Sequence, residues 1–208
     1  MLGTQHYWLF LLSGVLLNLT PGQDTLYIIG RSIAQGQRAG LLSALGISCG
    51  SVVHTLAAAF GLSAILATSA VAFSVIKFAG AAYLVYLGVK MWLERPKAQE
   101  NPAAPKPAGS RGIFSAAVLT NVLNPKVALF YLAFLPQFVD PAANSKLLAF
   151  LFLGATFITT GTIWCLILAL AAAKVASLIQ ARKSAGNAAR RAVGTLFFGL
   201  GVKLAVTK

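Results

Sequence analysis

Two long stretches of this 208-residue chain, residues 41–76 and 147–173, contain no Asp, Glu, Lys or Arg. Each stretch is longer than the roughly 20 apolar residues that an α-helix needs to cross the hydrocarbon core of a bilayer. Because the bilayer core offers no water to backbone groups, a chain segment of this kind satisfies its own hydrogen bonds as a helix. The two stretches therefore predict a chain that is mainly helical and lies mainly in lipid.

The composition supports a membrane protein and argues against a soluble one. Hydrophobic residues make up 58% of the chain and charged residues 10%, whereas soluble domains carry about 25% charged residues. This composition excludes a disordered chain and a disulfide-stapled secreted module, and it makes a soluble enzyme a poor fit. The N-terminus is apolar but lacks the basic start of a signal peptide, so we expect it to be a retained first span.

Apolar runs and turn signals predict an all-α integral membrane protein with six transmembrane helices in a single domain, residues 1–208. The predicted spans are residues 7–35, 38–65, 69–93, 112–138, 146–173 and 192–207. A polar segment that contains four prolines follows the third span and predicts a solvated linker at 94–111. The linker divides the chain into repeat one, residues 1–93, and repeat two, residues 112–208.

The basic residues predict the orientation of the spans. The net charge is +13, from 17 Lys and Arg against 4 Asp and Glu. No stretch resembles a nucleic-acid-binding module, so we expect no nucleic-acid partner. Short cytoplasmic loops are enriched in Lys and Arg. Four basic residues belong to one side, and twelve belong to the other: Arg31, Arg38, Lys90, Arg95, Lys97, Lys106, Arg111, Lys174, Arg182, Lys183, Arg190 and Arg191. The side with twelve is predicted to be cytoplasmic, which places both termini outside.

The first and fourth spans each contain a helix break. Thr20-Pro21-Gly22 interrupts the first, and Asn124-Pro125 interrupts the fourth. Each repeat has three spans, an odd number, so the second copy is predicted to be inverted in the membrane. Inverted repeats whose helices are interrupted at matching positions point to the binding site of a transporter.

The chemistry of a break explains why it can bind a solute. Proline removes an N–H donor and disrupts the helix, and the new helix start presents N–H groups that attract anions such as a carboxylate. We predict Thr20 and Asn124 as N-caps, each followed by proline at the first helical position. The candidate substrate and coupling residues at the two breaks are Asn18, Thr20, Pro21, Gly22, Asn121, Asn124 and Pro125. The competing interpretation of each proline is a packing kink.

Three ionisable residues inside the spans complete the candidate site. Asp24 is the only acid within any span, and it could bind a substrate ammonium group, carry a coupling proton, or merely complement a helix dipole. Lys126 could interact with Asp24 or a substrate carboxylate, or extend toward water. Gly46 and Gly50, four residues apart, are predicted to let another helix approach closely. His54 shares their helix face and could relay protons or pack through a hydrogen bond. Four tyrosines could line a cavity or anchor at the interface: Tyr27, Tyr83, Tyr86 and Tyr131.

Other classes of function have weaker sequence support. No metal-binding or catalytic motif occurs, so we expect no enzyme, no metal site and no cofactor. Cys49 and Cys165 occupy corresponding spans, which leaves a membrane thiol–disulfide electron carrier as the alternative. A structural membrane protein without a substrate would need neither the two breaks nor an acid within a span.

Four motifs resemble the LysE/RhtB family of amino-acid exporters. They are TPGQD at 20–24, GQRAG at 36–40, FAGAAYLVYLG at 78–88, and NPK at 124–126 with FLPQF at 134–138. Together they cover nearly the whole chain. The family more often has proline between the glycine and the acid, where this chain has Gln23.

This resemblance implies a secondary, proton-driven exporter of amino acids in the bacterial cytoplasmic membrane. One acid and one lysine within the spans suit a zwitterion, which favours small neutral substrates such as homoserine, threonine or leucine. The implied partners are an amino acid, protons and the lipid bilayer. Self-association into a homo-oligomer is left open.

Overall fold

The structure is a computed structural model, and it describes residues 3–68, 71, 75, 78, 107–140 and 142–181. Nearly all of the predicted third span, most of the linker and the whole predicted sixth span lie outside the described residues. The described residues are helical apart from short connections and an isolated bridge between Thr4 and Val139. This confirms an all-α protein.

The first half of the described chain contains two helices and their extensions. Helix α1 spans Tyr7–Leu19 and α2 spans Gln23–Ala57, followed by a π-helical segment, η1 (Ala58–Leu62), and by α3 (Ser63–Thr68). Two helices are joined within α2, because Gly36 has φ 80° and ψ −175°, a conformation that essentially only glycine adopts. The chain reverses there, and Ser32 lies against Gly40. The chain therefore breaks in the gap between the spans predicted to end at 35 and to begin at 38.

The second half begins with α5 (Ser110–Val122) and α6 (Pro125–Leu129). A π-helical segment, η2 (Phe130–Phe134), and a 3₁₀ segment, η3 (Leu135–Phe138), continue from α6. The path bends by 46° between α5 and the α6–η3 segment. Helix α7 spans Lys146–Ala181, so it extends beyond the predicted end of the fifth span at 173. The Ala-rich sequence there contains no proline or glycine to stop the helix.

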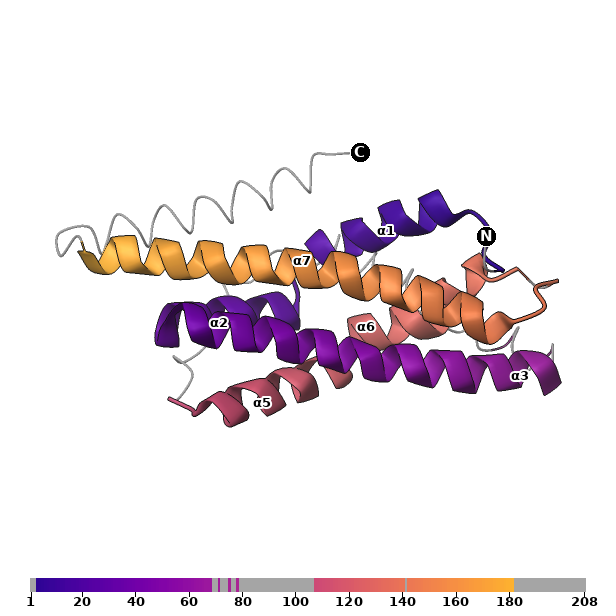
Figure 1. Ribbon diagram of the computed structural model, residues 1–208, viewed down its shortest axis with the longest axis horizontal. Coiled ribbons are helices and arrows are strands. Elements are labelled where there is room, and N and C mark those ends of the chain that lie inside the picture. Colours follow the sequence, from indigo (N-terminus) through magenta and orange to yellow (C-terminus); the bar gives the residue numbers. More distant parts are fainter. Residues whose placement is uncertain are drawn as a thin grey trace.

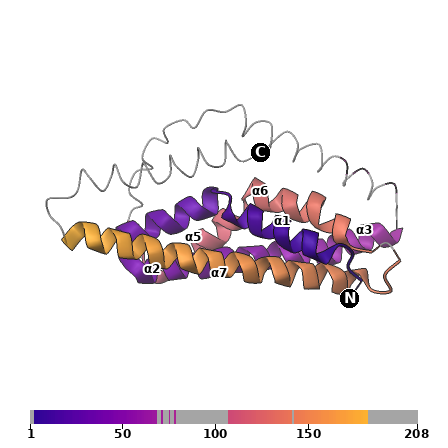
Figure 2. The same cartoon turned by 90° about the horizontal axis from the view of Figure 1, so that it is seen from above.

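The helices form an elongated bundle (Figures 1 and 2). Helix α7 lies beside the second arm of α2, residues 37–57, and runs in the opposite direction (Figure 1). Helix α1 and the first arm of α2, residues 23–35, run toward the Gly36 end, whereas α5 and α6 run away from it (Figure 1). The two interrupted helices therefore run in opposite directions within the bundle.

Some of the described helices are long and apolar enough to cross a membrane. Two segments, Gln23–Ile65 and Lys146–Leu178, are long and apolar enough to cross a bilayer, and the bent pair Ser110–Val122 with Pro125–Phe138 makes a third candidate. Large apolar side chains on several helices are exposed, for example Trp8, Leu12 and Ile163. Exposed apolar surface of this extent suits contact with lipid rather than water.

Close contact between α2 and α5 depends on two glycines. A Cβ atom at Gly46 would lie 2.6 Å from both the Ala117 Cβ and the Phe114 carbonyl oxygen, and one at Gly50 would lie 2.7 Å from the Asn121 Cβ. These separations are too short for real Cβ contacts, so the helices reach this distance only because both positions are glycine. The predicted role of the Gly46/Gly50 face is confirmed, and the contact places Asn121 beside α2.

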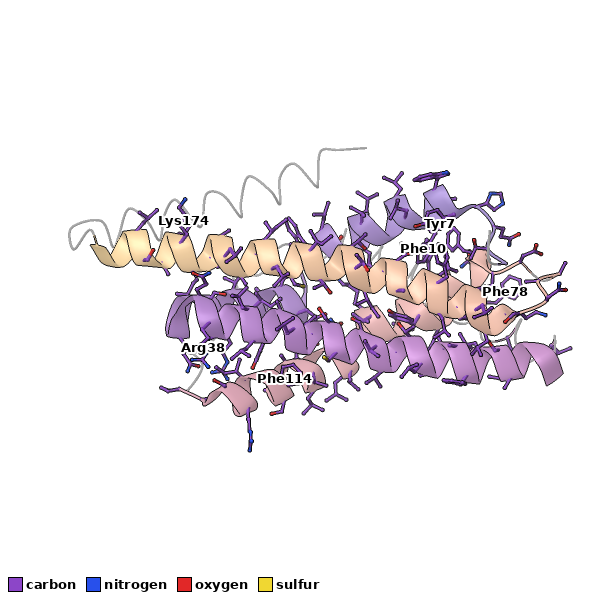
Figure 3. The ribbon with its side chains drawn as sticks, viewed as in Figure 1. Tyr7, Phe10, Arg38, Phe78, Phe114 and Lys174 are labelled. Atoms are coloured by element: carbon purple, nitrogen blue, oxygen red, sulfur yellow. The ribbon has the colours of Figure 1, made fainter. Side chains whose placement is uncertain are left out.

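Two apolar clusters lie along the bundle. The larger is aromatic and includes Phe10, Phe130 and Phe157, with the Phe130 and Phe157 rings stacked at 4.2 Å. The smaller contains Ile28, Ala44, Ile47, Ala117, Cys165 and Ala169. Tyr7 and Phe10 lie toward one end of the bundle, and Arg38 and Lys174 lie toward the other (Figure 3).

Candidate transport site

The first helix break lies where α1 ends and α2 begins. Helix α1 ends at Leu19, and α2 starts at Gln23 with Gly22 as its N-cap. Gly22 is extended, with φ −158° and ψ −168°, and Asp24 lies in the first turn of α2. The predicted interruption of the first span is confirmed.

The predicted capping of this break was wrong. Thr20 is the C-cap of α1, and its hydroxyl donates to the Leu16 carbonyl at 2.8 Å instead of accepting from a new helix start. Pro21 precedes the helix rather than occupying its first position. The reason is that Thr20 and Gly22 are both extended, which moves the start of α2 two residues along the chain. Residues before proline favour such extended conformations.

The second break has the predicted geometry. Helix α5 ends at Val122, and α6 begins with Pro125 at its first position. Asn124 is the N-cap, and its side-chain oxygen accepts from the Lys126 backbone N–H at 3.0 Å. Proline has no N–H to lose at this position, so the cap and the proline together define a stable helix start.

Lys126 connects the second break to the first. Its Nζ donates to the carbonyl oxygens of Thr20 at 2.8 Å and Leu17 at 3.1 Å. These are main-chain groups at the C-terminal end of α1, where helix carbonyls run short of intrahelical donors, and the Leu17 oxygen otherwise accepts only the shared Thr20 N–H among the described residues. Both hydrogen bonds therefore go to carbonyls and neither goes to Asp24, although Lys126 is close enough to interact electrostatically with that carboxylate.

Asn121 makes the reverse connection. Its side chain is 1% exposed, and its Nδ2 donates to Asp24 Oδ2 at 2.8 Å. Asn121 precedes the second break, and Asp24 follows the first. The side chains of Asn121 and Lys126 thus each join the second break to the first, through hydrogen bonds between residues 97 and 109 positions apart in the sequence.

Two polar atoms at this junction, Asp24 Oδ1 and Asn124 Nδ2, are buried without a well-formed hydrogen bond among the described residues, and the Asn124 side chain lies near enough to interact with the Asp24 carboxylate. One is an acceptor and the other is a donor. Gly22 has no side chain with which to cap the first N–H groups of α2, so these donors also face the break. Buried polar groups without hydrogen bonds are costly in an apolar environment, which makes this junction the candidate position for a polar ligand.

A further polar network extends from Asn121 toward the aromatic cluster. His54 Nε2 lies 3.1 Å from the Asn121 main-chain oxygen, and the His54 ring stacks on Tyr131 with centroids 5.6 Å apart. Because a carbonyl oxygen only accepts, the nitrogen in this contact carries a proton. His54 therefore packs through a hydrogen bond beside the site, and whether it also relays protons stays a prediction.

Ser51 and Thr55 belong to this network, and the sequence analysis did not predict them as residues near the site. Ser51 Oγ donates to Asn121 Oδ1 at 3.3 Å, and Thr55 Oγ1 is hydrogen-bonded to the buried Tyr131 hydroxyl at 2.8 Å. The available signal was their spacing, because two hydroxyl residues four positions apart in a charge-free run share one helix face. Tyr131 is thereby assigned to the interior rather than to an interfacial anchor.

Asn18 lies at the edge of the site. Its Nδ2 donates to Thr160 Oγ1 at 3.2 Å, and its side chain packs against Gly161 of α7. This contact fixes the last turn of α1 against α7, one residue from the Leu17 carbonyl that Lys126 binds. Asn18 is not brought into hydrogen-bond contact with Asp24 or Asn121.

The cysteines give no support to the electron-carrier alternative. Cys49 is exposed on α2 and Cys165 is buried on α7, and both are free. Cys165 belongs to the smaller apolar cluster, where it packs as a small apolar residue. Among the described residues, no group of three or more His, Cys, Asp or Glu side chains could hold a metal ion.

The fold and the junction define a class of protein: a helical membrane protein with oppositely directed interrupted helices that meet around buried ionisable groups, as in secondary transporters. The chain belongs to the family of LysE type translocators, whose family model matches residues 15–208. The resemblance seen in the four motifs is thereby confirmed.

Individual relatives match almost the full length of the chain. A leucine efflux protein of Salmonella typhimurium is 29% identical over 203 residues, which cover 98% of this chain and 96% of the relative. An uncharacterized membrane protein of Vibrio cholerae is 33% identical over 204 residues, with 98% of each chain covered. One of Pseudomonas aeruginosa is 32% identical over 208 residues, covering 98% of this chain and 96% of the relative. No solved structure matches the chain.

Proposed function

We propose that this protein exports amino acids across the bacterial cytoplasmic membrane and that the junction of the two breaks is its substrate site. The observation that carries the proposal is the meeting of the buried Asp24 Oδ1 and Asn124 Nδ2 beside the uncapped start of α2, since neither atom has a well-formed hydrogen bond among the described residues. A free amino acid has one ammonium group and one carboxylate, which are the complements of a carboxylate acceptor and a group of N–H donors. Similarity to a leucine efflux protein supports the same function.

The geometry suggests how such a zwitterion is oriented. The ammonium group binds Asp24 Oδ1, while the carboxylate accepts from Asn124 Nδ2 and from the N–H groups at the start of α2. Lys126 Nζ has three donors and uses two on carbonyls, so its third can also reach a carboxylate at the break. The charges of Asp24 and Lys126 cancel, and a site without net charge favours small neutral amino acids of the homoserine, threonine or leucine type.

Asp24 also offers a simple means of coupling export to protons. A carboxylate that binds a substrate ammonium group cannot bind a proton at the same oxygen, so the two compete. If substrate is released outside and a proton takes its place, return of the protonated site to the cytoplasmic side completes an antiport cycle. The proton then leaves Asp24 for the cytoplasm, and the carboxylate can bind the next substrate.

The proposed membrane arrangement is six spans in two inverted repeats with both termini outside. Its support is the opposite direction of the two interrupted helices (Figure 1) and the position of the basic residues. Arg38 and Lys174 lie at the same end of the bundle (Figure 3). Gln35 at that end donates to the Ala108 carbonyl, which brings the start of α5 with Arg111 to the same end. The positive-inside rule makes this end cytoplasmic.

Export can be tested in inside-out membrane vesicles with a panel of labelled amino acids. An acidic vesicle lumen should drive concentrative uptake of at least one small neutral amino acid, and a protonophore should abolish the concentration gradient. Vesicles that lack the protein provide the background. If uptake of every amino acid in the panel stays at background with and without the gradient, the proposed function is wrong.

The orientation can be tested with compartment-specific reporters. A reporter that is active only in the cytoplasm should be active when inserted in the 94–111 linker, because that segment belongs to the basic side. A reporter that is active only outside should be active when fused after Lys208. The reverse pattern would contradict both the orientation and the argument from the basic residues.

A further inference from the structure

The C-terminal end of α1 presents carbonyl groups in the middle of the bundle, at its junction with α2 (Figure 1). Thr20 binds one of them, the Leu16 oxygen, through its hydroxyl, and its N–H is shared between the Leu16 and Leu17 oxygens at 3.1 and 3.2 Å. Pro21 has no N–H to donate, and the oxygens of Leu17 and Thr20 converge on one point. A helix C-terminus also carries the negative end of the helix dipole. Such a point in an apolar interior is suited to a cation.

The cation found there belongs to the other half of the protein. Lys126 Nζ donates to both oxygens, and its aliphatic stem passes over Gly22. A Cβ atom at Gly22 would lie 3.4 Å from Nζ and 3.7 Å from Cε, in ordinary van der Waals contact, so the Lys126 side chain passes close to the main chain of the first break. The ammonium group is held by two main-chain oxygens with the Asp24 carboxylate nearby, which is the kind of ligand set that unwound transporter helices offer to a small cation.

We propose that the Leu17 and Thr20 carbonyls form a binding site for one primary ammonium group and that Lys126 is its built-in occupant. The tethered ammonium links the two interrupted helices, provides the Thr20 carbonyl with a hydrogen-bond donor, and adds a second donor to the Leu17 carbonyl, which also accepts from the Thr20 N–H. Because the site is filled by a side chain, the wild-type protein needs no external cation to hold this junction. Removal of the side chain leaves a site that a small soluble ammonium ion can enter.

The test is chemical rescue of Lys126→Ala, measured as the melting temperature of the purified protein. Methylammonium has the N–H donors and the charge of the lost group, so it should raise the melting temperature of this variant in a saturable manner. Tetramethylammonium has the charge but no N–H donor and should have no such effect. Lys174→Ala, which removes an exposed lysine near the end of α7 (Figure 3), is the matched control and should respond to neither cation.

Equal responses of Lys126→Ala and the wild type to methylammonium, or equal effects of the two cations on the variant, would overturn the proposal. If Lys126→Ala accumulates in membranes only when methylammonium is present, the proposal is supported. If it fails to accumulate with either cation while Lys126→Met accumulates and melts like the wild type, the position needs no cation and the proposal is wrong. The readout is stability, so the result does not depend on which solute the protein exports.

Discussion

Replacement of Asp24 by Asn is expected to abolish proton-coupled export while the protein still inserts and folds. The amide has nearly the same shape as the carboxylate, and its oxygen can still accept the hydrogen bond that Asn121 donates to Asp24. It can neither bind a proton nor offer a negative charge to an ammonium group, so we expect a rate loss of at least about tenfold, corresponding to about 1.4 kcal/mol. Asp24→Glu keeps the charge and should retain part of the activity.

The measurement is efflux from proteoliposomes at several pH values, with equal amounts of reconstituted protein. Asp140→Asn is the matched control, because Asp140 lies in the turn before α7 and accepts from the Ala142 N–H. This control should export at the wild-type rate. Wild-type rate and pH dependence in Asp24→Asn would remove Asp24 from the mechanism and leave the backbone groups of the breaks as the candidate site.

The second large effect is expected at the contact between α2 and α5. Gly46→Ala places a methyl group 2.6 Å from the Phe114 carbonyl oxygen, which belongs to the backbone and can move away only if the helices separate. Overpacking of this kind costs about 1–3 kcal/mol. We therefore expect lower membrane accumulation and a lower melting temperature than for the wild type. Gly30→Ala is the control, since a Cβ there meets nothing within 4 Å.

Gly50→Ala should differ from Gly46→Ala in one respect. The added methyl group would meet Asn121, the residue that binds Asp24, so export should fall by more than the loss of folded protein explains. Export activity per folded molecule separates the two effects. Equal activity per folded molecule in the two variants would show that the position of Asn121 has no influence on the site.

Features with strong local chemistry could be predicted from the sequence. Pro21 and Pro125 fixed both helix breaks because a proline N cannot donate within a helix. The gap between the first two predicted spans falls at Gly36, whose backbone conformation requires glycine, and Gly46 and Gly50 indicated a close helix contact. The position directly before proline correctly predicted the capping role of Asn124, whereas the same reasoning failed at Thr20.

The partners of these residues could not be predicted in the same way. Helix periodicity places Lys126 and Asn121 near a break, but it does not say that one binds the end of α1 and the other binds Asp24. Those contacts depend on how the two halves pack. The misplaced cap at Thr20 has a similar cause, because the extended conformation of Gly22 is set by the path between helices. The π-helical segments η1 and η2 could not be predicted either, because the pattern of apolar residues does not distinguish them from α-helix.

The contact between Lys126 and α1 also has a consequence for how the protein is made. The chain turns back at Gly36 over a few residues, so the two arms of α2 can pair as soon as both have left the ribosome. The partner of the Thr20 carbonyl, Lys126, is 106 residues further along the chain. Synthesis of that length of chain takes on the order of 5–20 s. During this interval the first half lies in the membrane with a helix end that only the second half can complete. The first half of the protein is thus complete only after Lys126 has been synthesised. A pause in translation before Lys126 prolongs the exposure of the C-terminal end of α1 to the insertion and quality-control machinery.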